Sequence, residues 1–551
     1  MWSRIYAFGR HHTLLQNATV NTLFRKFAVP GLLPFPIPSY TIYVGRRAAP
    51  PYHAFLRSAS EEAIVDIRLL IGLLLALVAW PDEGPPPAAA VCALPLAAFL
   101  AALAFYGLAA RGLLVALARR GAAPQRIALW HGRAMRLFGL LWLGGYGALL
   151  FLARWPNLAA DWAPEEFWLA YRFVLLLPLL AALPVVWWGN FLSSRVLRRI
   201  PGLWPGAPAE AGLKFSHYLA FQIRHQLLVM LLPFVFVLGA RDAVVFAAGG
   251  DASGEVSELA VSGAVVVVYL FSPLMMRLVW PVTRLAPGPL RGQLESAAAR
   301  AGVRVADIFL WRTGAFMVNA CLAGVIRPVR YVFLSEALAR DFHPSQVEAV
   351  FGHELGHARY HHLAFYFLIA LGGAVLAGLL APLAGLLGGL SEDWLAAAVL
   401  IVYWGGFFGY LSRRFERQSD LAGARFVACP GESEPAACAY HQPTVELTES
   451  GRPEPGPRDN DLICPYQAWA FTSALTRLAA LNGLATSARS WRHGSIAARV
   501  EFTSSMIGRP EAVRRYDRRL RRFKLFFCLL MLLAAGWLLA ANFAAGFLSR
   551  P

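Results

Sequence analysis

Long apolar runs are the feature that most limits how this sequence can fold. A helix needs about 20 apolar residues to cross the roughly 30 Å hydrocarbon core of a bilayer. About nine segments approach that length: 64–80, 88–110, 137–153, 167–192, 226–247, 259–280, 363–387, 395–411 and 525–547. With 57% apolar and only 15% charged residues, the chain is too hydrophobic for an ordinary soluble protein. We therefore predict a mainly α-helical protein with about nine transmembrane helices in a lipid bilayer.

The polar segments between these runs differ in charge, which predicts how the chain is oriented. Loops 111–136 and 193–225 together hold eleven basic residues and one carboxylate. Four other loops hold eleven carboxylates and two arginines: 81–87, 154–166, 240–258 and 388–394. Basic loops remain on the cytoplasmic side of a membrane. The larger polar blocks 281–362 and 412–524 are then expected in the cytoplasm.

The composition also bears on compartment and partners. The six cysteines lack paired spacing, which favours a reducing compartment over a secreted disulfide framework. Arginine far outnumbers lysine and alanine is abundant, which suggests a GC-rich bacterial genome and hence a bacterial inner membrane. The arginines behind the net charge of +18 cluster beside apolar segments, so anionic lipid explains them better than nucleic acid. No lysine stands in a Walker A phosphate loop or a Ser-x-x-Lys motif, so we expect neither an ATP-driven motor nor a penicillin-binding domain.

The alternation of apolar and polar segments predicts the domain organisation. The expected order is an N-terminal tail (1–62), about six transmembrane helices (63–282), the first part of an α+β domain (283–362), two transmembrane helices (363–411), the second part of that domain (412–524) and a C-terminal transmembrane helix (525–551).

Periodicity within the polar blocks predicts their local structure. Helices are expected at Leu290–Ala301 and over 344–362, which begins with a proline suited to a first helical turn. Alternation of apolar and polar residues predicts short strands at Val303–Leu310 and Tyr331–Leu334. The stretch 429–465 is rich in Pro, Gly and acidic residues and has no periodicity, so we interpret it as a loop insertion.

One predicted helix carries the motif His353-Glu354-Leu355-Gly356-His357. Histidines four positions apart share one face of a helix and can bind a single zinc ion, with the glutamate beside them to activate water. This pattern is typical of metallopeptidases. The many charged residues of 335–362 exclude a metal helix buried in lipid.

A catalytic zinc site needs a third protein ligand and leaves its fourth position open for water. Glu416 fits this role, because it follows two membrane segments and so returns beside the first polar block. Asp420, one turn later, shares its face and can accept the free N–H of a ligating histidine. A solvated helix of alternating charges is the alternative interpretation. His361 and His362 lie too far along the first helix to be ligands, and we interpret them as solvated or interfacial.

Four landmarks, taken in order over roughly 285–505, resemble the M48 family of integral-membrane zinc metallopeptidases. They are Asn319-Ala320 before a strand, His353-Glu354-x-x-His357, Glu416-x-x-x-Asp420, and His493-Gly494-Ser495-Ile496 with Arg499. The family usually has alanine before the aspartate and proline after the late histidine, where this chain has Ser419 and Gly494.

The resemblance implies a gluzincin-like cytoplasmic domain with one Zn²⁺ per chain, bound by His353, His357 and Glu416. Glu354 would be the general base, and Asp420 would support a ligating histidine. The remaining implied roles concern the substrate. Asn319 and Ala320 would align its backbone, while His493 and Arg499 would hold the oxyanion or the substrate carbonyl near the metal.

The function expected from these features is zinc-dependent endoproteolysis of membrane or membrane-associated proteins, in bacterial membrane-protein quality control. The expected partners are protein or peptide substrates and the lipid bilayer, with no nucleic acid and no ATP. Two alternatives stay open. One is a narrow-specificity regulatory or CaaX-type processing protease, and the other is a catalytically silent membrane scaffold.

Overall fold

The structure is a computed structural model of the 551-residue chain. It describes residues 67–81, 84, 86–200, 214–249, 254–314, 316–380, 383–385, 392–429, 438, 440–441, 445–447, 453–455, 459–482, 484 and 486–548. The predicted tail 1–62 lies outside the described residues, as does most of the predicted insertion 429–465.

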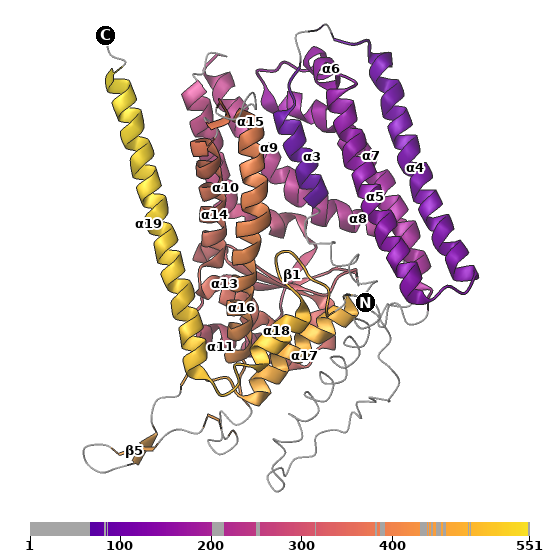
Figure 1. The fold of residues 1–551 in the computed structure, drawn as a ribbon. Coiled ribbons are helices and arrows are strands. Elements are labelled where there is room, and N and C mark those ends of the chain that lie inside the picture. The colour runs from indigo at the N-terminus through magenta and orange to yellow at the C-terminus, as the bar shows by residue number, and fades with distance from the viewer. Residues whose placement is uncertain are drawn as a thin grey trace, which may run out of the picture. The chain divides into compact units, whose positions relative to one another are not determined.

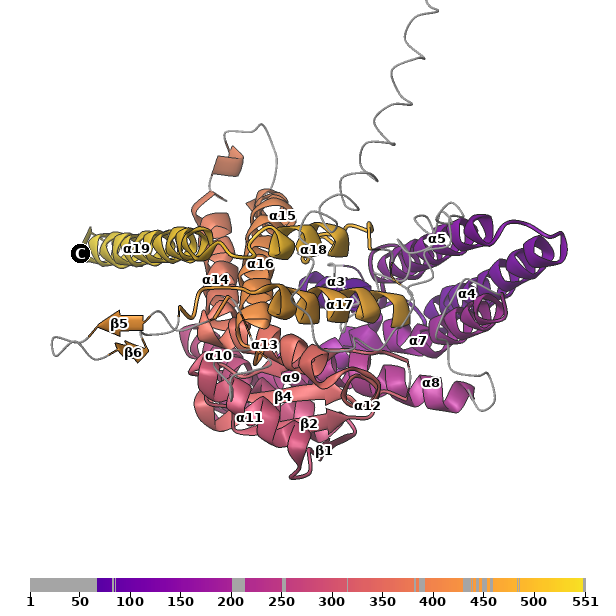
Figure 2. The ribbon, with the colours of Figure 1, turned by 90° about the horizontal axis from the view of Figure 1, so that it is seen from below.

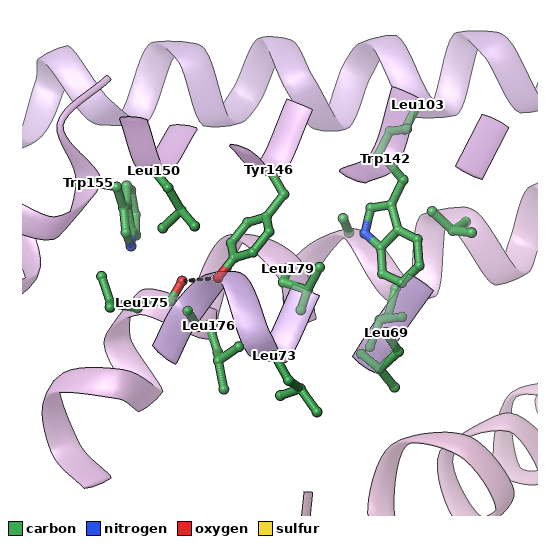
Figure 3. Close-up of a cluster of buried hydrophobic side chains, with 14 of the residues drawn as sticks. Leu69, Leu73, Leu103, Trp142, Tyr146, Leu150, Trp155, Leu175, Leu176 and Leu179 are labelled. Atoms are coloured by element: carbon green, nitrogen blue, oxygen red, sulfur yellow. Dashed lines mark hydrogen bonds between the residues drawn. The ribbon is translucent and has the colours of Figure 1, made fainter. Parts of the chain in front are cut away.

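The first half of the described chain is helical (Figure 1). Its helices are α3 (Ile67–Val78), α4 (Ala89–Arg119), α5 (Pro124–Phe151), α6 (Trp155–Trp162), α7 (Trp168–Arg198), α8 (Phe215–Gln222), α9 (Leu228–Ala247) and α10 (Gly254–Val279), with a π-helical turn at Ile223–Leu227. Helices α3, α5 and α7 share a buried apolar core, part of which is drawn in Figure 3. In this core the Tyr146 hydroxyl donates to the Leu175 carbonyl at 3.1 Å, which satisfies the one polar atom of a fully buried ring.

A buried arginine closes the end of α3. Arg172 of α7 donates from Nη1 to the carbonyl of Ala76 at 2.9 Å and to that of Ala79. Its guanidinium carbon lies 3.9 Å from the ring centroid of Trp80. The last carbonyls of a helix have no partner within the helix, so this side chain supplies donors that the apolar surroundings do not.

Six helices within the described residues are long and apolar enough to cross a membrane. They are Val91–Arg119, Arg126–Phe151, Trp168–Arg198, Phe215–Ala247, Val256–Val279 and His362–Leu380. Each overlaps one of the predicted segments. The other three predicted segments, 64–80, 395–411 and 525–547, coincide with helices that are not among these six, and each of them includes residues that the structure describes incompletely or not at all. Composition and helix length therefore indicate an integral membrane protein. That it has nine transmembrane helices stays a prediction.

A four-stranded sheet follows α10. Its strands are β1 (Val282–Arg284), β2 (Asp307–Trp311), β3 (Ala320–Ala323) and β4 (Tyr331–Ser335), in the spatial order β1-β2-β4-β3. Strands β2 and β4 are parallel, with Phe309 opposite Phe333, and the two outer pairs are antiparallel. Strand β3 is therefore an edge of the sheet.

The remaining elements are mostly helices. They are α11 (Pro289–Ala301), a 3₁₀ turn (Arg327–Val329), α12 (Glu336–Asp341), α13 (Pro344–Arg359), α14 (His362–Leu380), α15 (Glu392–Val402), a π-helical segment (Tyr403–Phe408), α16 (Gly409–Arg425), the strands β5 (Val445–Leu447) and β6 (Pro453–Pro455), α17 (Pro465–Leu481), α18 (Ile496–Ser504) and α19 (Pro510–Leu548). Figure 2 shows α13 between the sheet and helices α16 and α17.

The helix predicted over 344–362 is shorter in the structure. Helix α13 ends at Arg359, and α14 begins at His362. Between them His361 has a φ of 57°, in the left-handed region that stops a right-handed helix. The chain therefore changes direction here, which separates the motif helix from the apolar helix that follows.

His225 and Ala488 provide two of the contacts that join the N-terminal helices to the rest of the described chain. His225, in the π-helical turn before α9, accepts a hydrogen bond at Nε2 from the Trp311 indole of β2 at 2.7 Å. The Trp311 ring also stacks on Trp280, with ring centroids 4.1 Å apart. Ala488, which precedes α18, packs among residues at the facing ends of α4, α5 and α7.

Helices α13 and α16 approach each other unusually closely. A Cβ added at Gly356 of α13 would lie 2.8 Å from the Ala422 Cβ and 3.0 Å from the Ser419 Cα of α16. A Cβ added at Gly423 of α16 would lie 2.9 Å from the Ala349 carbonyl oxygen. Only glycine fits where two helix backbones are this close, so these positions set the separation of the helices.

We expect Gly356→Ala to destabilise the protein by about 1–3 kcal/mol, the usual cost of overpacking a filled interior. The matched control is Gly112→Ala in α4, where an added Cβ has no neighbour within 4 Å. This control should be neutral or slightly stabilising, because alanine is the better helix former. Thermal unfolding in detergent compares the two variants, and equal unfolding temperatures would contradict the close-packing argument.

Candidate metal centre

Local sequence explains where the motif helix begins. His343 is the N-cap of α13, and its Nδ1 accepts the Ser345 backbone N–H at 3.3 Å. The Gln346 side chain accepts the His343 backbone N–H at 3.2 Å in return, which completes a capping box. Pro344 occupies the first helical position, where its missing N–H costs nothing.

Three side chains from two helices converge at the α13–α16 contact. The Nε2 atoms of His353 and His357 lie 3.3 Å apart. Glu416 of α16 places one carboxylate oxygen 3.6 Å from the His353 Nε2 and the other 3.7 Å from the His357 Nε2. One donor atom from each residue fits within a 4.8 Å group that could hold a metal ion.

The donor set fits zinc in type and in spacing. Zinc in proteins takes imidazole nitrogen and carboxylate oxygen at about 2.0–2.2 Å, and tetrahedral ligands at that distance lie about 3.3–3.6 Å from one another. The 3.6 Å contact of Glu416 with His353 falls within this range, and the 3.7 Å contact with His357 lies just beyond it. Two histidines and one glutamate also leave the fourth position open, as in catalytic zinc sites.

Asp420 and Arg499 support the first histidine. Asp420, fully buried one turn after Glu416, places Oδ1 3.1 Å from the His353 Nδ1. Arg499 of α18 holds the same carboxylate from the other side, with Nε 2.9 Å from Oδ2 and Nη2 2.5 Å from Oδ1. Burial alone would raise the pKa of Asp420, but the Arg499 charge and the contacts with His353 and Arg499 together lower that pKa. An ionised Asp420 at this distance favours the proton of His353 on Nδ1, which leaves Nε2 to bind a metal.

His362 supports the second histidine, and it is not solvated, which was one of the two environments predicted for it. His362 is fully buried, and its Nδ1 lies 3.2 Å from the His357 Nδ1. Its Nε2 lies 3.0 Å from the Gln418 amide oxygen. These contacts let His357 donate from Nδ1 while keeping Nε2 free. Burial lowers the pKa of His357 to about 3, so its ring is neutral, as a metal ligand must be.

Ser419, where the M48 family usually has alanine, also belongs to this arrangement. Its hydroxyl lies 3.3 Å from the His362 Nδ1. The His362 ring stacks on Phe415, with centroids 4.4 Å apart and the planes 5° from parallel. The break at His361 turns the chain so that His362 faces the centre, whereas a helix continued from His357 would have carried it away.

Glu354 lies beside the two histidines and faces the edge of the sheet. Its Oε2 accepts the backbone N–H of Leu322 in β3 at 2.8 Å. Burial raises the pKa of Glu354, and the neighbouring His353 charge only partly offsets this. A carboxylate whose pKa is raised is a stronger base, which suits proton transfer near neutral pH.

Strand β3 presents an unpaired edge to this carboxylate. The Asn319 carbonyl accepts the Ser335 backbone N–H at 2.9 Å, and the Asn319 N–H donates to the Ser335 hydroxyl at 3.0 Å. Hydrogen-bonding groups alternate along a strand, so the backbone of Ala320, like that of Leu322, points away from β4. Of the predicted pair, Ala320 thus offers its backbone to the free edge, and Asn319 anchors the strand.

His493 reaches Glu416 from a tight loop. Its Nδ1 lies 3.0 Å from Oε2 of Glu416, and its side chain is 46% exposed. Ser490 and Gly494 exchange backbone hydrogen bonds of 3.0 and 2.9 Å around this loop. Gly494 has a φ of 75°, which proline cannot adopt, so glycine suits this position where the family usually has proline.

Trp491 fastens the loop to the helix that carries Glu416. Its indole donates to the Gly405 carbonyl at 2.8 Å, within the π-helical segment where backbone bonding is rearranged. Its own carbonyl accepts from Arg413 of α16 at 2.7 Å. The neighbouring His493 is thereby held relative to Glu416. Burial alone would raise the pKa of Glu416, but His493 and Arg499 hold it well below its usual value.

Residues 287–485 match the family model of Peptidase family M48. The chain carries an M48 peptidase domain. A solved structure described as "Crystal Structure of S. mikatae Ste24p" is similar over 77% of this chain and 100% of that chain, with 13% identity and a TM-score of 0.47. No curated protein matches the chain significantly. The M48 match includes His353, His357 and Glu416 but ends before His493 and Arg499, so the assignment of the last two depends on geometry alone.

We expect His362→Phe to weaken zinc binding by about 10–100-fold, the range found when a partner of a metal-ligating histidine is lost. Phenylalanine keeps the stacking on Phe415 but cannot accept the His357 N–H. The control is His361→Asn, because His361 is exposed and asparagine tolerates its left-handed backbone. Competition with a chromophoric chelator measures both affinities, and equal affinities would show that the His362 contact does not orient His357.

Proposed function

We propose that this chain is a membrane-embedded zinc-dependent endopeptidase that hydrolyses peptide bonds of membrane or membrane-associated proteins. The observation that carries the proposal is the convergence of His353, His357 and Glu416 at metal-ligand spacing, with Glu354 between them and the free edge of β3. The M48 domain and the apolar helices of the same chain support a metallopeptidase at a membrane.

In this proposal each residue has a defined task. Bound zinc supplies Lewis-acid polarisation of the peptide carbonyl and lowers the pKa of water. Glu354 accepts a proton from the attacking water and passes it to the leaving amine. The edge of β3 aligns an extended substrate through its backbone, largely independently of side chains. His493, which is part-exposed, faces the substrate carbonyl.

We propose a task for Arg499 that differs from the one expected. Both of its bonded nitrogens contact Asp420, and Nη2 is also 3.5 Å from Oε2 of Glu416. Its side chain is only 11% exposed. We therefore assign Arg499 to holding Asp420 and Glu416 in place, and leave the contact with the substrate to His493.

We expect Glu354→Gln to abolish proteolysis while the zinc content stays at the wild-type level, because Glu354 is a base and not a ligand. Glu416→Ala should lose activity together with one zinc ion per chain. Casein or membrane-protein cleavage and metal analysis of detergent-purified protein measure both effects. Retained cleavage in Glu354→Gln would overturn the mechanism. Wild type that binds zinc at this centre but cleaves nothing would favour the silent scaffold.

The proposed setting is the cytoplasmic side of a bacterial inner membrane, in membrane-protein quality control. The charge asymmetry of the loops supports this orientation. Helices α4 and α5 join through the basic loop at the end of the bundle that carries the peptidase elements, and α6 lies at the opposite end (Figure 1). A narrow regulatory or CaaX-type specificity would use the same centre and would appear as cleavage of few substrates.

Labelling of intact cells with a membrane-impermeant thiol reagent tests the orientation. Ala248→Cys lies at the exposed end of α9, in an acidic loop, and should be labelled above the wild-type level. Ser296→Cys lies on the exposed face of α11 in the M48 domain and should be labelled only after permeabilisation. The reverse pattern would place the active centre on the outer face.

A further inference from the structure

A second group of metal-ligating side chains lies apart from the catalytic centre. Cys429, Cys438, His441 and Cys464 place one donor atom each within 4.8 Å of one another. The cysteines are free thiols, and two of them, Cys429 and Cys464, are buried. In the sequence, Cys429 and Cys464 stand near the two ends of the segment 429–465, and Cys438 and His441 stand between them. The sequence alone therefore does not show that the four side chains lie close together.

The distances match tetrahedral coordination and are too long for a disulfide bond. The sulfur atoms of Cys429 and Cys464 lie 3.8 Å apart, far beyond the roughly 2.05 Å of an S–S bond. Two thiolates bound to zinc at about 2.3 Å are separated by about 3.8 Å in a tetrahedron. The Cys438 sulfur lies 3.6 Å from the His441 Nδ1, and zinc-bound sulfur and nitrogen are separated by about 3.5 Å.

The orientation of His441 points to the same ligand set. Its Nε2 lies 3.3 Å from the backbone carbonyl of Leu462, which can only accept a hydrogen bond. The ring proton is therefore on Nε2, and Nδ1 presents its lone pair to the three sulfurs. A carbonyl that fixes the tautomer in this way is the usual outer partner of a metal-binding histidine. The backbone N–H of His441 also bonds the Cys438 carbonyl at 3.0 Å, in the tight turn that brings both donors to one side.

The surrounding fold holds the two buried cysteines together. Gln467 in the first turn of α17 accepts the Cys464 N–H at 3.2 Å and donates to the Val427 carbonyl at 2.9 Å. Ala428, next to Cys429, donates its backbone N–H to the buried Glu348 carboxylate at 3.1 Å. Cys464 is also the N-cap residue of α17, where the helix dipole favours a thiolate.

We propose that Cys429, Cys438, His441 and Cys464 form a structural Zn²⁺ site that closes the base of the 429–465 segment. Three thiols and one imidazole fill all four positions, as in structural zinc sites, and leave none for water or substrate. The site joins the chain leaving α16 to the start of α17. These helices carry Glu416, Asp420 and Phe471, whose ring stacks on His353 at 6.0 Å, so the second zinc would brace both helices that flank the catalytic centre.

Metal analysis and cobalt substitution of the full-length protein in detergent test this site. Wild type should hold two zinc ions per chain. Loaded with Co²⁺, it should show the near-ultraviolet sulfur-to-cobalt charge-transfer absorption, which only thiolate ligands give. Cys438→Ser should lose one zinc ion and the charge-transfer band. His441→Ala should also lose one zinc ion. The control Cys528→Ser, a half-buried cysteine of α19, should keep both.

The same measurements separate this proposal from the proposed function. His353→Ala should lose one zinc ion and keep the charge-transfer band, because it empties only the catalytic centre. One zinc ion per chain in wild type with no charge-transfer band would overturn the structural site and leave the peptidase proposal standing. The structural site would also be overturned if the charge-transfer band persisted in Cys438→Ser, or if the protein held iron in place of zinc. It would likewise be overturned if the denatured, chelator-treated protein had only four titratable thiols, because the other two cysteines would then form a disulfide. The cobalt spectrum of the wild-type protein requires no mutation. It therefore tests the structural zinc site even if a variant fails to fold.

Discussion

The candidate metal centre depends on the close approach of helices α13 and α16. Two histidines on one helix cannot complete a zinc site, and the proposed third donor, Glu416, lies on a helix more than fifty positions later in the chain. Gly356 and Gly423 remove the side chains that would keep the two backbones apart. The same approach brings Asp420 to His353 and Gln418 to His362. His353 therefore receives its partner directly from this helix–helix contact, and His357 receives support from it through His362, which contacts Gln418.

How much of this could be predicted depended on whether the signal was local. The motif on α13, the strand at Tyr331–Ser335 and the helix at Pro289–Ala301 follow from spacing and periodicity within short windows. The role of His362 does not, because it requires the left-handed break at His361, a conformation that sequence gives no reason to assign to histidine. Arg499 was recognised, but its contact with Asp420 could not be predicted, since only the folded chain places its guanidinium against that carboxylate.

The Cys and His cluster marks another limit of local patterns. Its members are separated by intervals that match no familiar zinc motif, and the composition of 429–465 indicated only a loop. The short spacing from Cys438 to His441 was the one available signal. The contact of Ala488 with the ends of α4, α5 and α7 is equally invisible in sequence. It places the base of the loop that carries His493 against the N-terminal helices, so that bundle is part of the frame that holds the centre.

The shortness of β3 limits what a substrate can gain by binding there. Only the backbones of Ala320 and Leu322 point to the free edge, and one N–H of these is already bonded to Glu354. Each new hydrogen bond contributes about 0.5–1.5 kcal/mol net, whereas opening a folded domain costs about 5–15 kcal/mol. In the proposed mode of binding, the edge cannot unfold its own substrate. Selection would then fall on segments that are already extended, so that the susceptibility of a protein follows its local unfolding equilibrium more than its sequence.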